Sequence, residues 1–294
     1  MLFIGGMLLL FVSADDNMAT SLHREDFAEY TARAKEWRTK GVFKGGGHGL
    51  GNIAISGRGS EVHAVAPFMS FLRSWLLSHS ISSVVEASAG HWPTGWQRMM
   101  QWPAVDYVGL DLLPVMVEDN DALVRATNGS FGLRSARFEA LDMLQQALPP
   151  ADLLLTKDTL IHFPNAEISR FLHLSITRCP PRFRYVMFVH DQLLETVGGN
   201  TDITRLNSFH PLNLSLAPFL LPTRLEYQWS PQDSRTPAGM STAGARSAHV
   251  ANVQLKASGS GSSSMQPRSK QLKRKVVEVM QISDLRCGSR KAYQ

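Results

Sequence analysis

Short runs of β-branched and aliphatic residues, each ending in a polar or acidic residue, recur along the middle of the chain. This pattern predicts strands at residues 83–86, 107–111, 136–142, 151–158, 184–191, 224–229 and 275–282. Several of these runs are almost continuously apolar. Because strands buried on both faces are typical of parallel sheets, we expect most of the predicted strands to run parallel.

Segments with apolar residues at helical spacing lie before and between the strands. Helices are predicted at residues 16–41, 67–79, 94–100, 113–126 and 165–177. The alternation of strands and helices implies right-handed crossovers within one sheet. The sequence therefore predicts an α/β fold with a seven-stranded, mostly parallel sheet and helices on both faces.

Composition divides the chain of 294 residues into four segments. Residues 1–14 are apolar, and residues 15–229 hold six of the predicted strands and form the main domain. Residues 230–267 are rich in Ser, Gly and Ala, which predicts a disordered insertion. Residues 268–294 are basic and contain the last predicted strand.

The positive charge of the chain is concentrated in this last segment. The net charge is +5, but residues 268–294 carry eight Lys and Arg against two Asp and Glu, so the rest of the chain is nearly neutral. A run such as RSKQLKRK at 268–275 is more often solvated than bound to phosphate. We therefore expect no specific nucleic-acid partner.

Residues 1–14 leave the cellular compartment open. They end like a signal peptide but have no Lys or Arg near their start, and the apolar run is too short to span a bilayer. The sequence fits the cytoplasm, or the secretory pathway if these residues are a signal peptide, without a stable transmembrane segment. The two cysteines, Cys179 and Cys287, exclude a disulfide scaffold and a cysteine-based zinc cluster, and we expect reduced thiols. The oligomeric state is left open.

Acidic residues end four of the predicted strands. They are Glu86, Asp111, Asp142 and Asp158, and Gly90 lies in the turn after the first strand. Open α/β sheets bind ligands at the carboxyl ends of their strands, where acids accept hydrogen bonds from ribose hydroxyls. Acids at these places also cap the helices that follow. The ordered set of four favours a nucleoside-containing ligand.

At these positions the sequence resembles the class I S-adenosylmethionine-dependent methyltransferases. It is similar to a small-molecule-type branch with a first motif like DVGCGDW, here EASAGHW at 86–92, and a second-strand motif like YIGVD, here YVGLD at 107–111. The segment DLLLTKDTLIH at 152–162 resembles the family's DLVLCRDVLQH. Three later segments, NTDI at 200–203, PLNL at 211–214 and APFLLP at 217–222, resemble the family's NTDI, PLDL and PPF-LP. The resemblance implies a Rossmann-like methyltransferase domain that covers roughly two thirds of the chain.

The resemblance implies S-adenosyl-L-methionine as the cofactor. Asp111 would bind both ribose hydroxyls, and Asp142 would accept from the adenine amine. The full implied cofactor site consists of Glu86, Ser88, Gly90, Asp111, Leu112, Leu141, Asp142 and Lys157. Glu86 and the turn after it would face the methionyl amine and carboxylate, and Lys157 would lie near the sulfonium.

Three residues are candidates for the acceptor side of the site. Asp158 could orient or deprotonate the acceptor, and His162 and His190 could act as bases toward a hydroxyl. For a histidine the alternative is a structural role. The expected acceptor is a small molecule, a sugar or a lipid. We expect no metal in the site.

The first motif departs from the family at three positions. Ser88 stands where the family has its first glycine, Ala89 precedes the second glycine, and His91 replaces an acid. A positive φ at Ser88 would cost roughly 1–2 kcal/mol. We therefore expect one of two functions. The protein is an enzyme that catalyses in-line methyl transfer, or it is a non-catalytic homologue that binds a cofactor or a partner. A nicotinamide oxidoreductase ranks third because no G-x-G-x-x-G follows the first strand. The glycine-rich residues 45–60 are predicted to form a lid over the cofactor.

Overall fold

The computed structural model describes residues 24–40, 54–128, 131–177, 179–193, 199–204, 208–230 and 273–284. The predicted apolar segment 1–14, residues 45–53 of the predicted lid and residues 231–267 of the predicted insertion lie outside these ranges. The division into segments at residues 14, 229 and 267 stays a prediction.

Seven strands and four α-helices make up the described part of the chain. The strands are β1 (Ser83–Ala87), β2 (Asp106–Asp111), β3 (Ser135–Ala140), β4 (Ala151–Lys157), β5 (Phe183–Leu193), β6 (Arg224–Trp229) and β7 (Lys273–Gln281). The helices are α1 (Arg24–Lys40), α2 (Val62–Ser78), α3 (Pro114–Ala126) and α4 (Asn165–Ser175).

The strands form one sheet in the order β3-β2-β1-β4-β5-β7-β6. Strands β3, β2, β1, β4 and β5 pair in parallel, whereas β7 is antiparallel to both β5 and β6. The chain moves outward from β1 to β3 and then returns to place β4 on the other side of β1. This reversal creates a topological switch point at the carboxyl ends of β1 and β4. The predicted seven-stranded, mostly parallel α/β sheet is confirmed.

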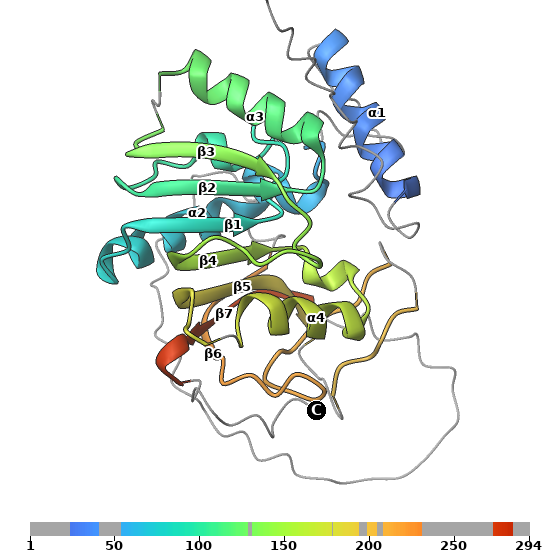
Figure 1. Ribbon diagram of the computed structural model, residues 1–294, viewed down its shortest axis with the longest axis vertical. Coiled ribbons are helices and arrows are strands. Elements are labelled where there is room, and N and C mark those ends of the chain that lie inside the picture. Colours follow the sequence, from blue (N-terminus) through green and yellow to red (C-terminus); the bar gives the residue numbers. More distant parts are fainter. Residues whose placement is uncertain are drawn as a thin grey trace, which may run out of the picture.

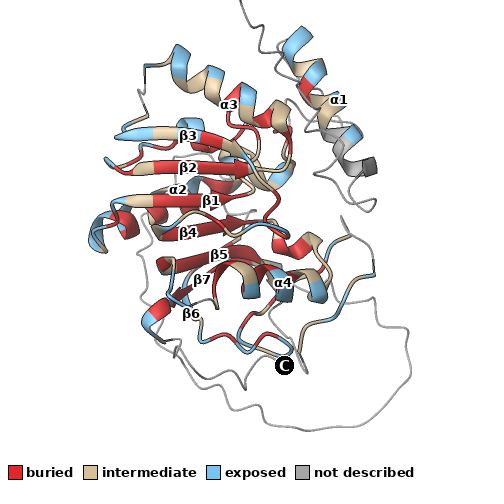
Figure 2. Cartoon of the chain, viewed as in Figure 1, coloured by how far each residue is buried: buried red, intermediate tan, exposed pale blue. Residues whose placement is uncertain are grey.

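Two apolar cores cover the two faces of the sheet (Figure 1, Figure 2). Val85 of β1 packs in the core that includes Phe171 of α4, and its neighbour Val84 packs in the core that includes Phe68 of α2. Successive residues of a strand point to opposite faces, so the apolar run in β1 contributes to both cores. Figure 1 accordingly shows α2 and α4 on opposite sides of the sheet.

Helix α1 lies beside α3 instead of packing on the sheet (Figure 1). Ala34 of α1 is buried in a small cluster with Ile55, Leu113 and Met116, and Trp37 packs against it. Because Leu113 and Met116 lie at the start of α3, α1 supports the polypeptide that follows β2.

Two of the predicted helices differ from the observed ones. Residues 94–100 contain only a 3-10 turn at Gln97–Met99, because Thr94 N–H and Gly95 N–H bond to His91 and Trp92 carbonyls in tight turns. Helix α2 begins at Val62, five residues before the predicted start at Pro67, so the proline lies inside the helix. The described part of helix α1 is Arg24–Lys40, and residues 16–23 of the predicted helix lie outside the described residues.

Cys179 is disulfide-bonded, which contradicts the expected reduced thiols. Cysteine spacing in the sequence does not reveal whether two cysteines approach each other in the fold.

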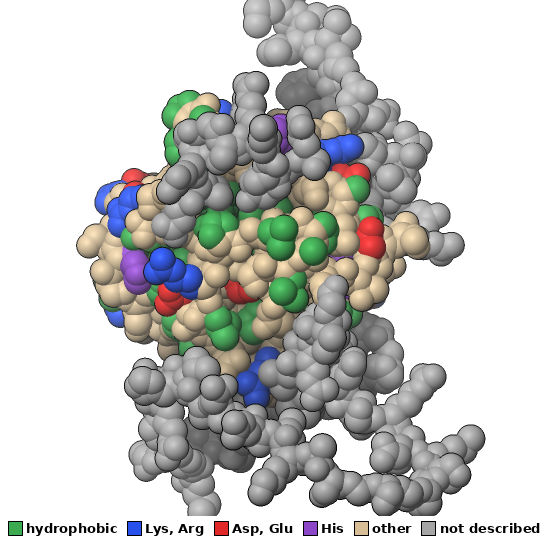
Figure 3. Space-filling view, turned by 90° about the horizontal axis from the view of Figure 1, so that it is seen from below, with side chains coloured by type: hydrophobic (Ala, Val, Ile, Leu, Met, Phe, Trp, Pro, Cys, Tyr) green, Lys and Arg blue, Asp and Glu red, His purple; other side chains and the backbone are tan. Residues whose placement is uncertain are grey.

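Within the described residues, no helix is both long and apolar enough to cross a membrane. On the face shown in Figure 3, Lys and Arg side chains lie apart from one another and do not form a continuous basic patch. The expectation of no specific nucleic-acid partner stays a prediction.

Candidate functional site

A cavity of about 230 Å³ opens at the carboxyl ends of the parallel strands. It lies at the topological switch point, where open α/β sheets bind their ligands. Ten of the eleven predicted site residues line it: Glu86, Ser88, Gly90, Asp111, Leu112, Leu141, Asp142, Lys157, Asp158 and His162. Ser56 and Ser60, in the described part of the predicted lid, also line the cavity.

The turn after β1 has an unusual backbone conformation. Ser88 has a φ of 60°, as expected if it keeps the shape of the glycine that it replaces, and Gly90 has a φ of 64°. Ala89 N–H donates to the Leu110 carbonyl over 2.7 Å, and Gly90 N–H donates to Asp111 Oδ2 over 2.9 Å. These two bonds fix the turn against the end of β2.

Replacing Ser88 with glycine is expected to raise the free energy of unfolding by about 1 kcal/mol, measured by urea denaturation. Glycine relieves the left-handed strain, and the serine hydroxyl makes only a 3.6 Å contact with Met143 Sδ. Gly90→Ala is the matched opposite change, because its Cβ would lie 2.5 Å from Ser56 Oγ. A neutral or destabilising Ser88→Gly would show that the serine is not strained.

Asp111 lies at the junction of this turn with α3. Its Oδ1 accepts from Leu113 N–H over 3.0 Å, and its Oδ2 accepts from Gly90 N–H. Burial raises the pKa of this carboxyl, whereas the hydrogen bonds from Leu113 and Gly90 act in the opposite direction. A carboxylate has about four acceptor sites, so Asp111 keeps capacity to accept a hydrogen bond from a ligand.

Glu86 is buried below the turn. Its Oε1 accepts from Gln97 Nε2 over 3.1 Å, and its Oε2 accepts from the Tyr107 hydroxyl. Burial raises the pKa of Glu86 to about 7, while the bonds from Tyr107 and Gln97 and the nearby Lys157 ammonium act to lower it. Gln97 and Tyr107 were not among the sequence-predicted site residues, although Tyr107 belongs to the YVGLD motif.

Asp142 lies two residues beyond the end of β3 and caps the turn that follows. Its Oδ1 accepts from Leu144 N–H and its Oδ2 from Gln145 Nε2, both over 2.9 Å. Leu141 N–H donates to the Asp111 carbonyl over 2.9 Å, which joins this turn to the end of β2. Asp142 therefore caps this turn and also lines the cavity.

Two lysines and two aspartates form a buried ionic cluster next to the cavity. Lys157 Nζ lies 2.6 Å from Asp158 Oδ2, and Lys275 Nζ bridges Asp158 Oδ1 and Asp191 Oδ2. Burial opposes ionisation of Asp158, but the Lys157 and Lys275 ammonium groups lower its pKa well below the usual range. A carboxylate held in this way is a poor base, so the ion pairs favour an orienting role for Asp158.

The two candidate histidines lie in different environments. His162 lines the cavity, and its Nδ1 donates to the Ser208 carbonyl over 2.9 Å. In the neutral ring this leaves Nε2 as the proton acceptor. His190 lies in β5 and is buried, with Nε2 3.2 Å from Glu278 Oε2 of the neighbouring strand β7, and the structure does not bring it to the cavity. This position indicates a structural role.

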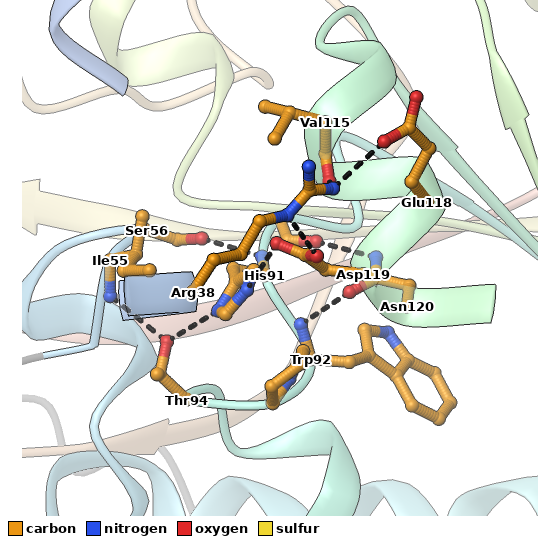
Figure 4. Close-up of polar contacts among 12 residues, drawn as sticks. Arg38, Ile55, Ser56, His91, Trp92, Thr94, Val115, Glu118, Asp119 and Asn120 are labelled. Atoms are coloured by element: carbon orange, nitrogen blue, oxygen red, sulfur yellow. Dashed lines mark hydrogen bonds and ion pairs between the residues drawn. The ribbon is translucent and has the colours of Figure 1, made fainter. Parts of the chain in front are cut away.

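The first-motif turn is also held from outside the sheet (Figure 4). Trp92 N–H donates to Asn120 Oδ1, and Asn120 Nδ2 donates to the Gly90 carbonyl, both over 2.8 Å. His91 N–H donates to Ser56 Oγ over 2.8 Å. The sequence pattern did not single out Asn120, because a buried asparagine and an exposed asparagine look the same in the sequence of a predicted helix.

No family model and no curated protein matches the sequence. The structure is similar to magnesium protoporphyrin IX methyltransferase from Synechocystis PCC 6803 with bound SAH, with 18% identity over 57% of this chain and 70% of that one, and a TM-score of 0.37. It is also similar to the N-terminal domain of EvdMO1 with SAH bound, with 11% identity over 90% of this chain and 98% of that one, and a TM-score of 0.45. A third similar structure is coclaurine N-methyltransferase, with 9% identity over 72% and 67% of the two chains and a TM-score of 0.40. These values do not assign the chain to a family.

Proposed function

We propose that this protein is an S-adenosyl-L-methionine-dependent methyltransferase. When bound, the cofactor supplies a methyl group activated by a sulfonium. The acceptor is a small molecule, a sugar or a lipid. The observation that carries the proposal is the carboxylate of Asp111 at the end of β2, next to a left-handed turn at the switch point of the sheet.

The residues of the cavity fit such a cofactor. Asp111 has acceptor capacity for a ribose diol, and Leu112 and Leu141 offer apolar surface for an adenine ring. The left-handed turn at Ser88 and Gly90 brings the backbone close to the cavity, where a methionyl tail would lie. Glu86 below this turn supplies a carboxyl group toward a methionyl amine.

His162 is the base that we propose for a hydroxyl acceptor. Its Nδ1–H is bound to the Ser208 carbonyl, so Nε2 can take the acceptor's proton as the methyl group is transferred. Asp158 and Lys157 orient the acceptor side through their ion pair. Positioning and exclusion of water supply the rest of the catalysis.

Titration of the purified chain with S-adenosylhomocysteine in a calorimeter tests the proposal. Asp111→Ala is expected to weaken binding by about 10-fold to 150-fold, the scale of 1.5–3 kcal/mol for hydrogen bonds to a charged group. Asp106→Ala is the matched control, because Asp106 lies at the opposite, exposed end of the same strand and pairs with Arg134. Equal affinity in wild type and Asp111→Ala, or no binding by the wild type, would contradict the proposal.

A non-catalytic cofactor-binding homologue is the second candidate, because Ser88 adopts a strained φ of 60° in the first motif. Release of S-adenosylhomocysteine from S-adenosylmethionine with a panel of hydroxyl, amine and carboxyl acceptors distinguishes the two. Turnover by the wild type that His162→Gln abolishes would support the enzyme. Cofactor binding without turnover on any acceptor would favour the non-catalytic candidate.

A further inference from the structure

His91 occupies the position of the acid in the resembling motif, and it takes part in a polar network that reaches α1 (Figure 4). The ring is buried, with Nδ1 2.9 Å from Thr94 Oγ1 and Nε2 3.2 Å from Asp119 Oδ2. Asp119 also accepts from Arg38 Nε over 2.7 Å. The network therefore connects the turn after β1 with α3 and α1.

Every hydrogen bond of this network can form when the His91 ring is neutral. Burial lowers the pKa of His91 to about 4, with the Asp119 carboxylate acting to raise it, so the ring is neutral near pH 7. The carboxylate of Asp119 can only accept, so His91 Nε2 carries the proton and Nδ1 accepts from the Thr94 hydroxyl. The same hydroxyl accepts from Ile55 N–H over 3.1 Å. Each of these polar groups thus has a partner.

The residue next to Asp119 completes the arrangement. Asn120 holds the Gly90 carbonyl and Trp92 N–H, so α3 holds the backbone on both sides of His91 and also the His91 ring. Trp37 of α1 packs edge-on against the same ring, with centroids 4.7 Å apart. The turn that lines the cavity is thereby fixed from two helices.

We propose that His91 and Asp119 are positioning residues that hold the first-motif turn in its cofactor-binding shape and replace the family's acid at position 91. This inference rests on the proposed function. It explains why the motif can lose its acid: the carboxylate of this site is supplied by α3, and a second carboxylate at position 91 would face it in a buried environment. Two buried carboxylates close together repel each other and cannot both ionise freely.

The test places the acid of the resembling family at position 91 and measures whether cofactor binding becomes weaker. His91→Asp is expected to weaken binding of S-adenosylhomocysteine by about tenfold at pH 7.5, because it leaves Thr94 without its acceptor ring and places a carboxylate toward Asp119. The double variant His91→Asp/Asp119→Asn removes one of the two charges and is expected to recover affinity to within about threefold of wild type. The KM for S-adenosylmethionine is expected to follow the same order, with a smaller change in kcat.

Two further variants control for unfolding. His91→Gln keeps a donor toward Asp119 and an acceptor toward Thr94 and is expected to bind within about twofold of wild type. Glu118→Gln removes the charge of an exposed partner of Arg38 at the edge of the network but leaves the Arg38–Asp119 pair in place, and it is expected to change binding of S-adenosylhomocysteine by less than about twofold. If the wild type does not bind, the proposed function fails. If the wild type binds and His91→Asp binds equally well or better, or if the double variant is as weak as His91→Asp, the positioning inference alone is wrong.

Discussion

Replacing Lys275 with methionine is expected to lower the free energy of unfolding by about 3–5 kcal/mol, measured by urea denaturation at pH 7. The side chain of Lys275 is 10% exposed and pairs with both Asp158 and Asp191. Removing one partner from a buried ion pair leaves an uncompensated charge, which costs more than the pair itself contributes. Here Asp191 would lose its ammonium partner and Asp158 would keep only Lys157.

Arg274→Met is the matched control for this change. Arg274 precedes Lys275 in β7, so its side chain points to the other face of the sheet, and it is only partly buried. Loss of its charge is expected to alter the free energy of unfolding by about 0.5 kcal/mol or less. Similar small effects from both variants would show that the Lys275 cluster is not buried in solution.

Glu86→Gln is expected to remove a pH dependence of about 3 kcal/mol from the stability of the protein. Burial raises the pKa of Glu86 from its ordinary value of 4.5 to about 7. As the pH rises from 4.5 to 7, the unfolded chain releases this proton and the folded chain retains it, so the free energy of unfolding falls over that interval and levels off above it. The free energy of unfolding of Glu86→Gln, taken relative to that of wild type, should therefore rise by about 3 kcal/mol between pH 4.5 and pH 7.

The measurement compares the free energies of unfolding of the two proteins at several pH values. His91 has a lowered pKa and contributes with the opposite sign, so the stability from this residue rises with pH between about 4 and its ordinary pKa of 6.5 and then levels off. This contribution is common to both proteins and cancels in their difference. A difference that does not change with pH would mean that Glu86 ionises normally in the folded protein.

The sheet was predictable because its strands are marked by their own residues. An apolar run such as LLLT in β4 is typical of a buried strand. Strand β6 was predicted with the same first and last residues that the structure gives. The helix predicted at 94–100 was wrong because its apolar side chains pack into the core from a turn. Trp96 is 1% exposed and Met100, four residues later, is 3% exposed, so the segment has helical spacing without forming an α-helix.

The cavity wall was predictable for the same reason as the sheet, since residues that follow parallel strands share one edge. The ionic cluster and the polar network were not, because each joins residues that are far apart in the sequence. Lys275 lies 117 positions from Asp158, and Arg38 lies 81 positions from Asp119. His190 illustrates the converse, because it also lies near the polar end of a predicted strand but does not line the cavity. It pairs with Val276 of β7, so its side chain lies on the same face of the sheet as Glu278, two residues further along β7.

The placement of β7 between β5 and β6 has a consequence for the order in which a nascent chain can assemble. Strand β6 is synthesised before β7, but its neighbour in the sheet is β7, so β6 can join the sheet only after β7 has paired with β5. Until then β5 presents an open edge, which is the kind of edge that pairs with other chains. The same late strand delivers Lys275 to Asp158. Asp158 therefore gains this second ammonium partner only when residues more than a hundred positions downstream have left the ribosome, and during that interval the edge of β5 needs protection from pairing with other chains.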